Sequence, residues 1–169
     1  MSERRTLRWI RISIGVLMLG LVVSGVTAFP LRLELEFASS VLHDSPVSVW
    51  LPDAVGWVDR VADALSDVDA RYPFIAYGTD WLAFAHLVIA VVFIGPLIDP
   101  VRNIWVIQFG VIACVGVVPL ALIAGSIRGI PLGWQLIDIS FGVVGAVPAV
   151  VAWRLTRRLE RMRAQTAAV

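Results

Sequence analysis

Four apolar stretches of membrane-spanning length constrain this chain of 169 residues more than any other feature of its sequence. About 20 apolar residues are needed to cross the hydrocarbon core of a bilayer as a helix, and no stretch carries more than one formal charge in its interior. One apolar run can be a buried helix of a soluble protein, but four in so short a chain cannot all be. We therefore expect spans at roughly residues 12–29, 81–97, 104–124 and 134–153.

The composition agrees with a membrane protein. Hydrophobic residues make up 59% of the chain and charged residues 16%, whereas soluble domains average about 45–50% and 25%. The formal net charge of +1, without a basic run interleaved with aromatic residues, argues against a nucleic-acid partner. The single cysteine excludes an intramolecular disulfide and a cysteine-rich metal site. We expect residues 1–169 to form a single membrane domain.

The positions of the arginines predict the orientation. Four arginines precede the first span and five follow the fourth, whereas residues 31–80 hold nine acidic residues against three arginines. Arginine-rich flanks remain on the cytoplasmic side, so the sequence predicts a multi-pass protein of the cell inner (plasma) membrane with both termini cytoplasmic and residues 31–80 outside. Tryptophans, which favour the headgroup level, lie at the span ends: Trp9, Trp81, Trp105, Trp134 and Trp153.

The first span also has features of a signal peptide, since Val26-Thr27-Ala28 resembles a cleavage site. Proline close to the cut hinders the peptidase, and Pro30 follows almost directly. We expect this segment to be retained as a span.

The segment between the first two spans is too long to be a simple connection and needs structure of its own. Strict alternation over Leu31–Phe37 predicts a strand or an extended edge lying on the membrane. From Pro52, apolar residues recur at helical spacing and predict an amphipathic helix of about 17 residues that ends before Tyr72. Its apolar side carries Val55, Val58, Ala62, Leu65 and Val68.

The expected fold class is therefore all-α: an integral membrane four-helix bundle with an external amphipathic helical cap between the first and second spans. Asp99-Pro100 is expected to begin the third helix, with the aspartate as its cap. Cys114, in mid-span, is expected to be a small packing residue. One face of the fourth helix should point into the bundle, and it carries Gln135, Asp138, Gly142, Gly145 and Ala149.

Ionisable groups inside a membrane are costly and are candidates for function. Asp80 stands at the outer mouth of the second span, and His86 lies about 9 Å deeper at helical rise. Asp138 shares a helix face with Gln135, and Arg128 lies in the short loop before that helix. By the predicted topology, all five belong to the outer half of the bilayer. The candidate ligand-binding residues are Asp80, His86, Arg128, Gln135 and Asp138.

Two interpretations of these residues remain open. They form either a polar pocket that binds a ligand, or a structural set in which Arg128 pairs with Asp138 or Asp80 and His86 bonds to a backbone carbonyl. Haem ligation needs two histidines at membrane depth, and only His86 qualifies. The GxSxG, HExxH and GxGD motifs of intramembrane proteases are absent. The residues therefore favour a protein that is not an enzyme without deciding the question, and they do not identify a cofactor.

The function predicted from these residues is an outward-facing intramembrane polar pocket that binds a small ligand or a proton. The alternative is a structural or assembly subunit of a larger membrane complex, and a membrane enzyme of unknown type is the third hypothesis. The expected partners are the lipid bilayer and either a second copy of the chain or a membrane-complex partner.

Three segments resemble those of an uncharacterised group of small bacterial four-span integral membrane proteins. They are Tyr77-Gly78-Thr79-Asp80-Trp81-Leu82-Ala83-Phe84-Ala85-His86, Asp99-Pro100-Val101-Arg102-Asn103-Ile104-Trp105 and Ile127-Arg128-Gly129-Ile130-Pro131. The resemblance covers roughly residues 72–155. It implies the four-span topology and no activity, cofactor or partner.

The orientation can be tested with single cysteines introduced at Ser66 and Gln165 in a Cys114→Ala background. Treating intact cells with an impermeant thiol reagent should label the cysteine at position 66 and leave that at position 165 unlabelled, because the arginine bias places them on opposite sides of the membrane. The reverse labelling pattern would overturn the predicted orientation.

Overall fold

The computed structural model describes residues 2–167, and 88% of the chain is helical. No strand occurs in this described part. The chain divides into two compact units, one formed by the described residues up to Leu21 and from Ile89 onward, the other by Val22–Val88. The helices are α1 (Glu3–Ala28), α2 (Leu31–His43), α3 (Val47–Trp50), α4 (Pro52–Arg71), the short 3₁₀ helix η1 (Pro73–Ile75), α5 (Tyr77–Val92), α6 (Ile94–Ile98), α7 (Ile104–Ile127) and α8 (Leu132–Ala167).

Four helical stretches are long and apolar enough to cross a membrane: Glu3–Ala28, Pro73–Ile98, Ile104–Ile127 and Leu132–Thr166. The all-α class and the number of predicted spans are therefore confirmed. The second stretch is interrupted between α5 and α6, since the ring of Pro96 excludes the carbonyl of the residue four positions earlier, where α5 ends. The first and fourth helices extend beyond the predicted spans through their arginine-rich flanks, because arginine, leucine and glutamate are good helix formers.

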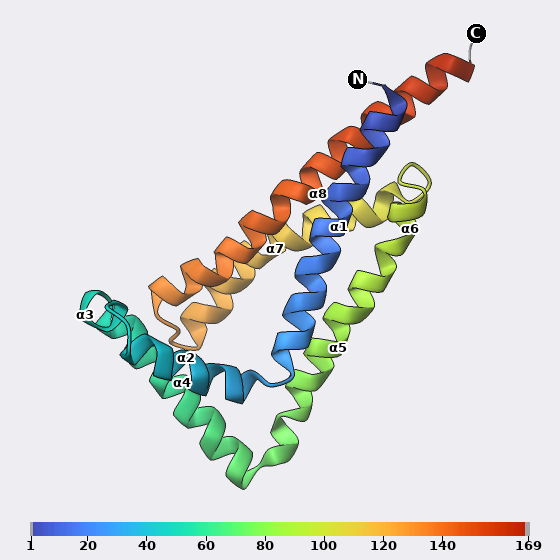
Figure 1. The fold of residues 1–169 in the computed structure, drawn as a ribbon. Coiled ribbons are helices and arrows are strands. Elements are labelled where there is room, and N and C mark those ends of the chain that lie inside the picture. The colour runs from blue at the N-terminus through green and yellow to red at the C-terminus, as the bar shows by residue number, and fades with distance from the viewer. Residues whose placement is uncertain (1, 168–169) are drawn as a thin grey trace. The chain divides into compact units, whose positions relative to one another are not determined.

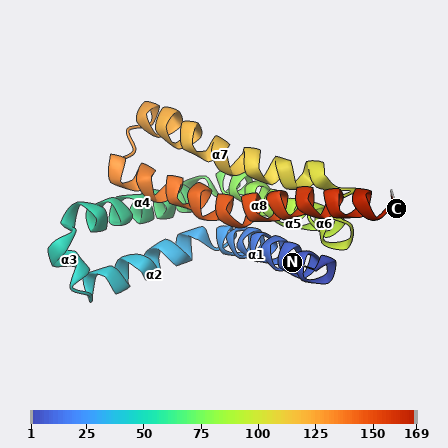
Figure 2. The ribbon, with the colours of Figure 1, turned by 90° about the horizontal axis from the view of Figure 1, so that it is seen from above.

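In the first unit, α7 and α8 form an antiparallel hairpin, and both views show them side by side (Figures 1 and 2). A Cβ atom added to Gly142 would lie 2.6 Å from the carbonyl oxygen of Cys114, and one added to Gly145 would lie 3.1 Å from its Sγ. The predicted face of the fourth helix therefore packs against α7, and Cys114 has the packing role expected of it. The place of this face in a four-helix bundle remains a prediction. The face continues in steps of seven residues, as in a helix-packing seam, through Gln135, Gly142, Ala149 and Thr156, all of them buried.

The hydrophobic core of the first unit is formed mainly by α1 and by the second half of α8, with one residue each from α7 and from the turn after α5. Ile10 and Ile14 of α1 cluster with Phe93, Ile107 and, on α8, with Ala152 and Leu159. Arg163 Nε donates to Glu3 Oε1 at 2.9 Å, so the start of α1 lies beside the end of α8 (Figure 1). These two helix ends therefore belong to the same end of the unit.

The connection between α6 and α7 corrects one prediction. Asp99-Pro100 does not begin the third helix; α7 starts at Ile104, and Asp99 Oδ1 instead accepts a hydrogen bond from the Arg102 amide within the preceding turn. Asn103 folds back, and its Nδ2 donates to the carbonyl oxygens of Gly95 at 3.1 Å and of Asp99 at 2.9 Å. The polar side chains here satisfy the terminal carbonyls of α6, which would otherwise lack partners.

In the second unit, α2 and α4 pack against each other as a hairpin joined by α3, here called the α2–α4 hairpin (Figure 2). The predicted strand at Leu31–Phe37 is wrong, because this segment is the first half of α2. Leucine, arginine and glutamate favour helix over strand, and Arg32 pairs with Glu36, one helical turn away, at 2.6 Å. The side toward α4 carries the half-buried Leu31, Leu35, Ala38 and Leu42.

The predicted amphipathic helix is present as α4, which begins at Pro52 as expected and ends at Arg71. Val55, Val58 and Ala62 of its predicted apolar side are buried, and Leu65 and Val68 are half-buried. The role of this helix as an external cap remains a prediction.

The buried side of α4 can be tested by comparing two substitutions. Val58→Asp should destabilise the α2–α4 hairpin by about 3 kcal/mol, because it buries a carboxylate without a partner. Asp63→Ser, on the exposed side, should change stability by less than about 0.5 kcal/mol. Hydrogen–deuterium exchange over residues 31–71 measures both effects. Equal protection in the two variants would show that the buried side has been misassigned.

Candidate functional site

The five predicted site residues fall in two units. Arg128, Gln135 and Asp138 belong to the first unit, and Asp80 and His86 belong to the second. Each group therefore has its own surroundings, and the convergence of all five in one pocket remains a prediction.

Gln135 is the most constrained of these side chains. It lies in the first turn of α8 with 4% of its surface exposed, and its Nε2 donates to the carbonyl oxygen of Ile130 at 2.8 Å. Across the hairpin, a Cβ atom added to Gly125 would lie 2.8 Å from Gln135 Cδ. Glycine at position 125 thus makes room for the amide. The loop between the helices turns through Gly129, which has a φ of 68°, a value that glycine adopts readily.

The second polar atom of this amide has no partner. Oε1 of Gln135 is buried and accepts no hydrogen bond from any residue that the structure describes. Buried side-chain acceptors are nearly always satisfied, and in lipid an open partner cannot be supplied by bulk water. The other buried side-chain polar atoms without a partner in the described part are the Thr156 hydroxyl oxygen, whose group can donate or accept, and the indole nitrogens of Trp57 and Trp153, which can only donate.

Asp138 follows Gln135 on the same side of α8. It is half-buried and occupies the first position of a second row of the seam, which continues in steps of seven through Gly145, Ala152 and Leu159. Residues three apart on a helix are surface neighbours, with Cβ atoms about 5–6 Å apart. Within the described residues, its carboxylate makes neither a hydrogen bond nor an ion pair. Two acceptors without donors therefore lie at the loop end of the α7–α8 hairpin.

Arg128 follows α7 directly, and its amide donates to the carbonyl oxygen of Ala124. Its side chain is exposed, and the described residues of this unit contain no ion pair between Arg128 and Asp138. Of the two pairings predicted for Arg128, the one within this unit is thus not formed. The one with Asp80 remains a prediction.

In the second unit, His86 and Asp80 both have local structural roles. His86 is half-buried, and its Nδ1 lies 2.8 Å from the carbonyl oxygen of Leu82, to which the protonated nitrogen donates. This is the hydrogen bond to a backbone carbonyl that the structural interpretation of the five residues predicts for His86. Asp80 lies in the first turn of α5, where a carboxylate stabilises the positive end of the helix dipole.

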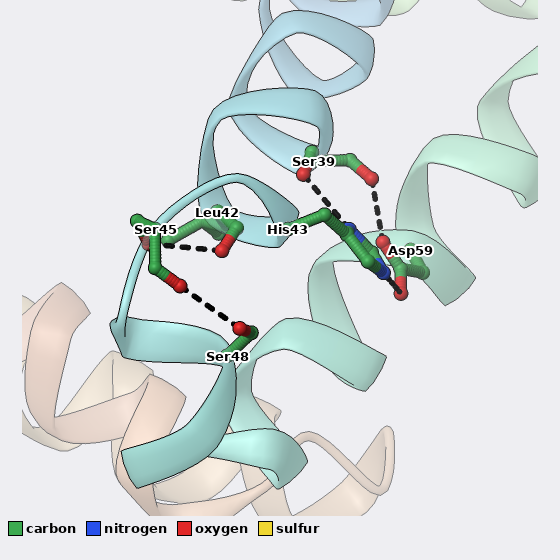
Figure 3. Close-up of polar contacts among 6 residues, drawn as sticks. All are labelled: Ser39, Leu42, His43, Ser45, Ser48 and Asp59. Atoms are coloured by element: carbon green, nitrogen blue, oxygen red, sulfur yellow. Dashed lines mark hydrogen bonds and ion pairs between the residues drawn. The ribbon is translucent and has the colours of Figure 1, made fainter.

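Sequence reasoning missed a polar cluster in the α2–α4 hairpin (Figure 3). Ser39 Oγ donates to Asp59 Oδ1 at 2.6 Å, His43 Nε2 lies 3.5 Å from Asp59 Oδ2, and His43 Nδ1 lies 2.9 Å from the Ser39 carbonyl oxygen. Ser39 and His43 are one helical turn apart, but the strand predicted before them concealed that spacing. These contacts hold α2 against α4.

The residue types of this cluster are those of a hydrolytic triad, but their order is different. In such a triad, histidine lies between serine and aspartate and removes the serine proton. Here Asp59 lies between Ser39 and His43, and the second nitrogen of His43 faces a backbone carbonyl. His43 therefore cannot act as a base toward the Ser39 hydroxyl, and the cluster is structural.

The same unit contains a cavity of about 270 Å³. Its wall includes Arg32 and Asp69, whose side chains pair at 3.3 Å, and the apolar Phe29, Leu65 and Ile75. The pair links the start of α2 to the end of α4. The cavity was not predicted, because it depends on the hairpin.

No group of histidine, cysteine, aspartate and glutamate side chains suited to a metal ion occurs within residues 2–167. Comparisons with protein-family models, with curated proteins and with solved structures find no match to this chain. The resemblance to small four-span proteins therefore remains a prediction.

The tight contact between Gly125 and Gln135 can be tested with a double-mutant cycle. Gly125→Ala should lower the free energy of unfolding by about 2 kcal/mol, because the new methyl group overpacks against Gln135. Combining it with Gln135→Ala should recover part of that loss, since the truncated side chain leaves room. Thermal unfolding in mild detergent measures both.

Gly116→Ala is the matched control, because a Cβ atom there would meet nothing within 4 Å. It should be neutral or slightly stabilising, since alanine favours helix over glycine. If Gly125→Ala were equally harmless, the close contact would be disproved.

Proposed function

We propose that this protein is a non-catalytic membrane protein that binds a small cationic hydrogen-bond donor, such as an ammonium group, at the loop end of the α7–α8 hairpin. The observation that carries the proposal is the buried Oε1 of Gln135, which accepts no hydrogen bond within the described residues. In this proposal Oε1 and the Asp138 carboxylate are the ligand-binding atoms.

The chemistry of the site selects the kind of ligand. Its two open groups are both acceptors, and one of them carries a negative charge when it is ionised. An unsatisfied buried acceptor costs about 1–3 kcal/mol, and a ligand with N–H or O–H donors would remove that cost. An anion would lie against Asp138 and would be repelled. The proposal therefore excludes carboxylates and phosphates as ligands of this site.

Arg128 is an exposed cation in the loop, three residues after Gly125. It would limit the access of ligands to the site from that side. Contributions of Asp80 and His86 to the same pocket remain part of the original prediction.

A second candidate function is that of an assembly subunit of a larger membrane complex. It is favoured by the exposed apolar side of α2, where Leu33, Phe37 and Val41 are 56%, 70% and 48% exposed. These residues recur at helical spacing and form one continuous stripe, a feature typical of interaction surfaces. A partner protein that co-purifies in mild detergent and is lost from a Phe37→Ser variant would support this function.

The ligand proposal can be tested with methylammonium chloride as the probe. At ten times its dissociation constant, the probe should stabilise the purified protein by about 1.4 kcal/mol and raise the melting temperature by about 3 °C, relative to sodium chloride at equal concentration. Asp138→Asn and Gln135→Leu should each remove the shift, and Asp63→Asn, in the other unit, should retain it. An equal shift in all variants, or no shift in the wild type up to the solubility of the probe, would overturn the proposal.

A further inference from the structure

The arginines of the first unit gather at the end where α1 begins and α8 ends. Nine of the 14 arginines of the chain belong to these two helix ends. The ion pair between Glu3 and Arg163 ties the ends together. Only two acidic residues, Glu3 and Glu160, accompany the nine arginines there.

Those two acidic residues already have partners. Glu3 pairs with Arg163 at 2.9 Å, and Glu160 pairs with Arg157 at 3.3 Å. Arg11 donates from Nε to the carbonyl oxygen of Leu97 at 3.2 Å, so it is held by the end of α6. The remaining arginines of α1 form no ion pair with any described residue; they are Arg4, Arg5 and Arg8.

The packing of α1 fixes the direction of these side chains. Thr6 and Ile10 are fully buried on one side of the helix, whereas the three arginines are exposed. Arg4 and Arg8 are one helical turn apart, and both line two adjoining open depressions on this exposed surface. Like charges at this spacing repel each other, and a bound anion between them would remove the repulsion.

The same depressions have apolar and aromatic walls. Ile12 lines both, Leu7 lines one, and Trp9, which is 47% exposed, lines the other. Ile12 is also the first residue of the apolar stretch of α1, directly after its last charge. From Arg4 to Ile12 the helix rises about 12 Å, so the surface passes from the charged flank into the apolar span.

We propose that this surface of α1, formed by Arg4, Arg5, Arg8, Trp9 and Ile12, binds an anionic phospholipid. The phosphate would lie between the guanidinium groups, which match its oxygens in a bidentate manner. Trp9 would lie at the headgroup level, and the upper part of an acyl chain would lie on Ile12. A free phosphate ion would meet only the arginines, so the apolar wall favours the lipid. The lipid would also supply the counter-charge that the described residues do not.

The experiment uses the full-length protein purified in a non-ionic detergent and titrated with phosphatidylglycerol or phosphatidylcholine, with native mass spectrometry counting the bound lipids. Phosphatidylglycerol should bind about tenfold more tightly than phosphatidylcholine, since each arginine near a membrane surface contributes measurably to the attraction of anionic lipid. Arg4→Gln with Arg8→Gln should reduce the affinity for phosphatidylglycerol about tenfold. Inorganic phosphate at a tenfold molar excess should not displace the lipid.

Two further variants make the result specific. Arg158→Gln with Arg161→Gln removes the same charge from α8, at exposed positions without an ion pair in the described part, and should keep the affinity within about threefold. Arg4→Lys with Arg8→Lys keeps the charge but cannot form the bidentate contact, so its affinity for phosphatidylglycerol should lie between those of the wild type and the glutamine variant. A melting temperature of the glutamine variant equal to that of the wild type shows that the loss of binding is not a folding defect. Equal losses from the α1 and α8 glutamine variants would show a diffuse charge effect and overturn the proposal. Displacement by phosphate would also overturn it, as would equal binding of the two lipids.

Discussion

A backbone polar group inside a bilayer must find its partner within the protein, and this constraint governs how the chain uses its few polar side chains. At the break after α5, Asn103 and Arg11 donate to carbonyl oxygens at the end of α6. His86 donates to the carbonyl of the preceding turn, and Gln135 donates to the loop that precedes its helix. These polar side chains thus complete the backbone, and that role accounts for their presence.

Two acceptor groups depart from this pattern, because they form no hydrogen bond with the backbone, and they are the ones that indicate a binding site. Oε1 of Gln135 and the carboxylate of Asp138 lie one turn apart at one end of the α7–α8 seam and receive no hydrogen bond from any described residue. A structural role explains Nε2 of the same amide but leaves Oε1 unexplained. If the side chain were only a loop anchor, a residue with a single donor would suffice. This difference separates the proposed site from the structural use of His86 and Asn103.

The sequence predicted the helices well where the local pattern was long and one-sided. The four apolar stretches, the helix from Pro52 and the side of α8 that packs against α7 follow from periodicity and residue size. The packing role of Cys114 follows from its small size and its place in mid-span, but its contact with α8 does not. The segment Leu31–Phe37 was wrongly predicted, because seven alternating residues also place Leu31 and Leu35 on one side of a helix. Its helical partner α4 and the pair between Arg32 and Asp69 decide between these structures, and neither is visible in a window of seven residues.

The site could be predicted only as a list of residues. The five candidates could be selected because a polar side chain inside a membrane carries a free-energy cost. Whether its polar atoms form hydrogen bonds depends on which carbonyl or amide group the fold brings close to them. The role predicted for Asp99 failed for a local reason, since the chain makes a further turn before α7 begins at Ile104 and the Asp99 carboxylate accepts a hydrogen bond from the Arg102 amide within that turn. Hydrogen-bond partners across a tertiary contact leave no trace in residue spacing.

The packing of the α7–α8 seam explains why the polar end is located where it is. Along most of its length the seam is lined by small residues, and Gly142 brings the α8 backbone against the Cys114 carbonyl with no space for a ligand. Near the loop, the absence of a side chain at Gly125 leaves room for the buried amide of Gln135. A seam selected only for close helix packing would place a second small residue opposite that glycine. Glutamine at this position leaves an open acceptor instead, and the proposed donor ligand would remove the free-energy cost of that acceptor.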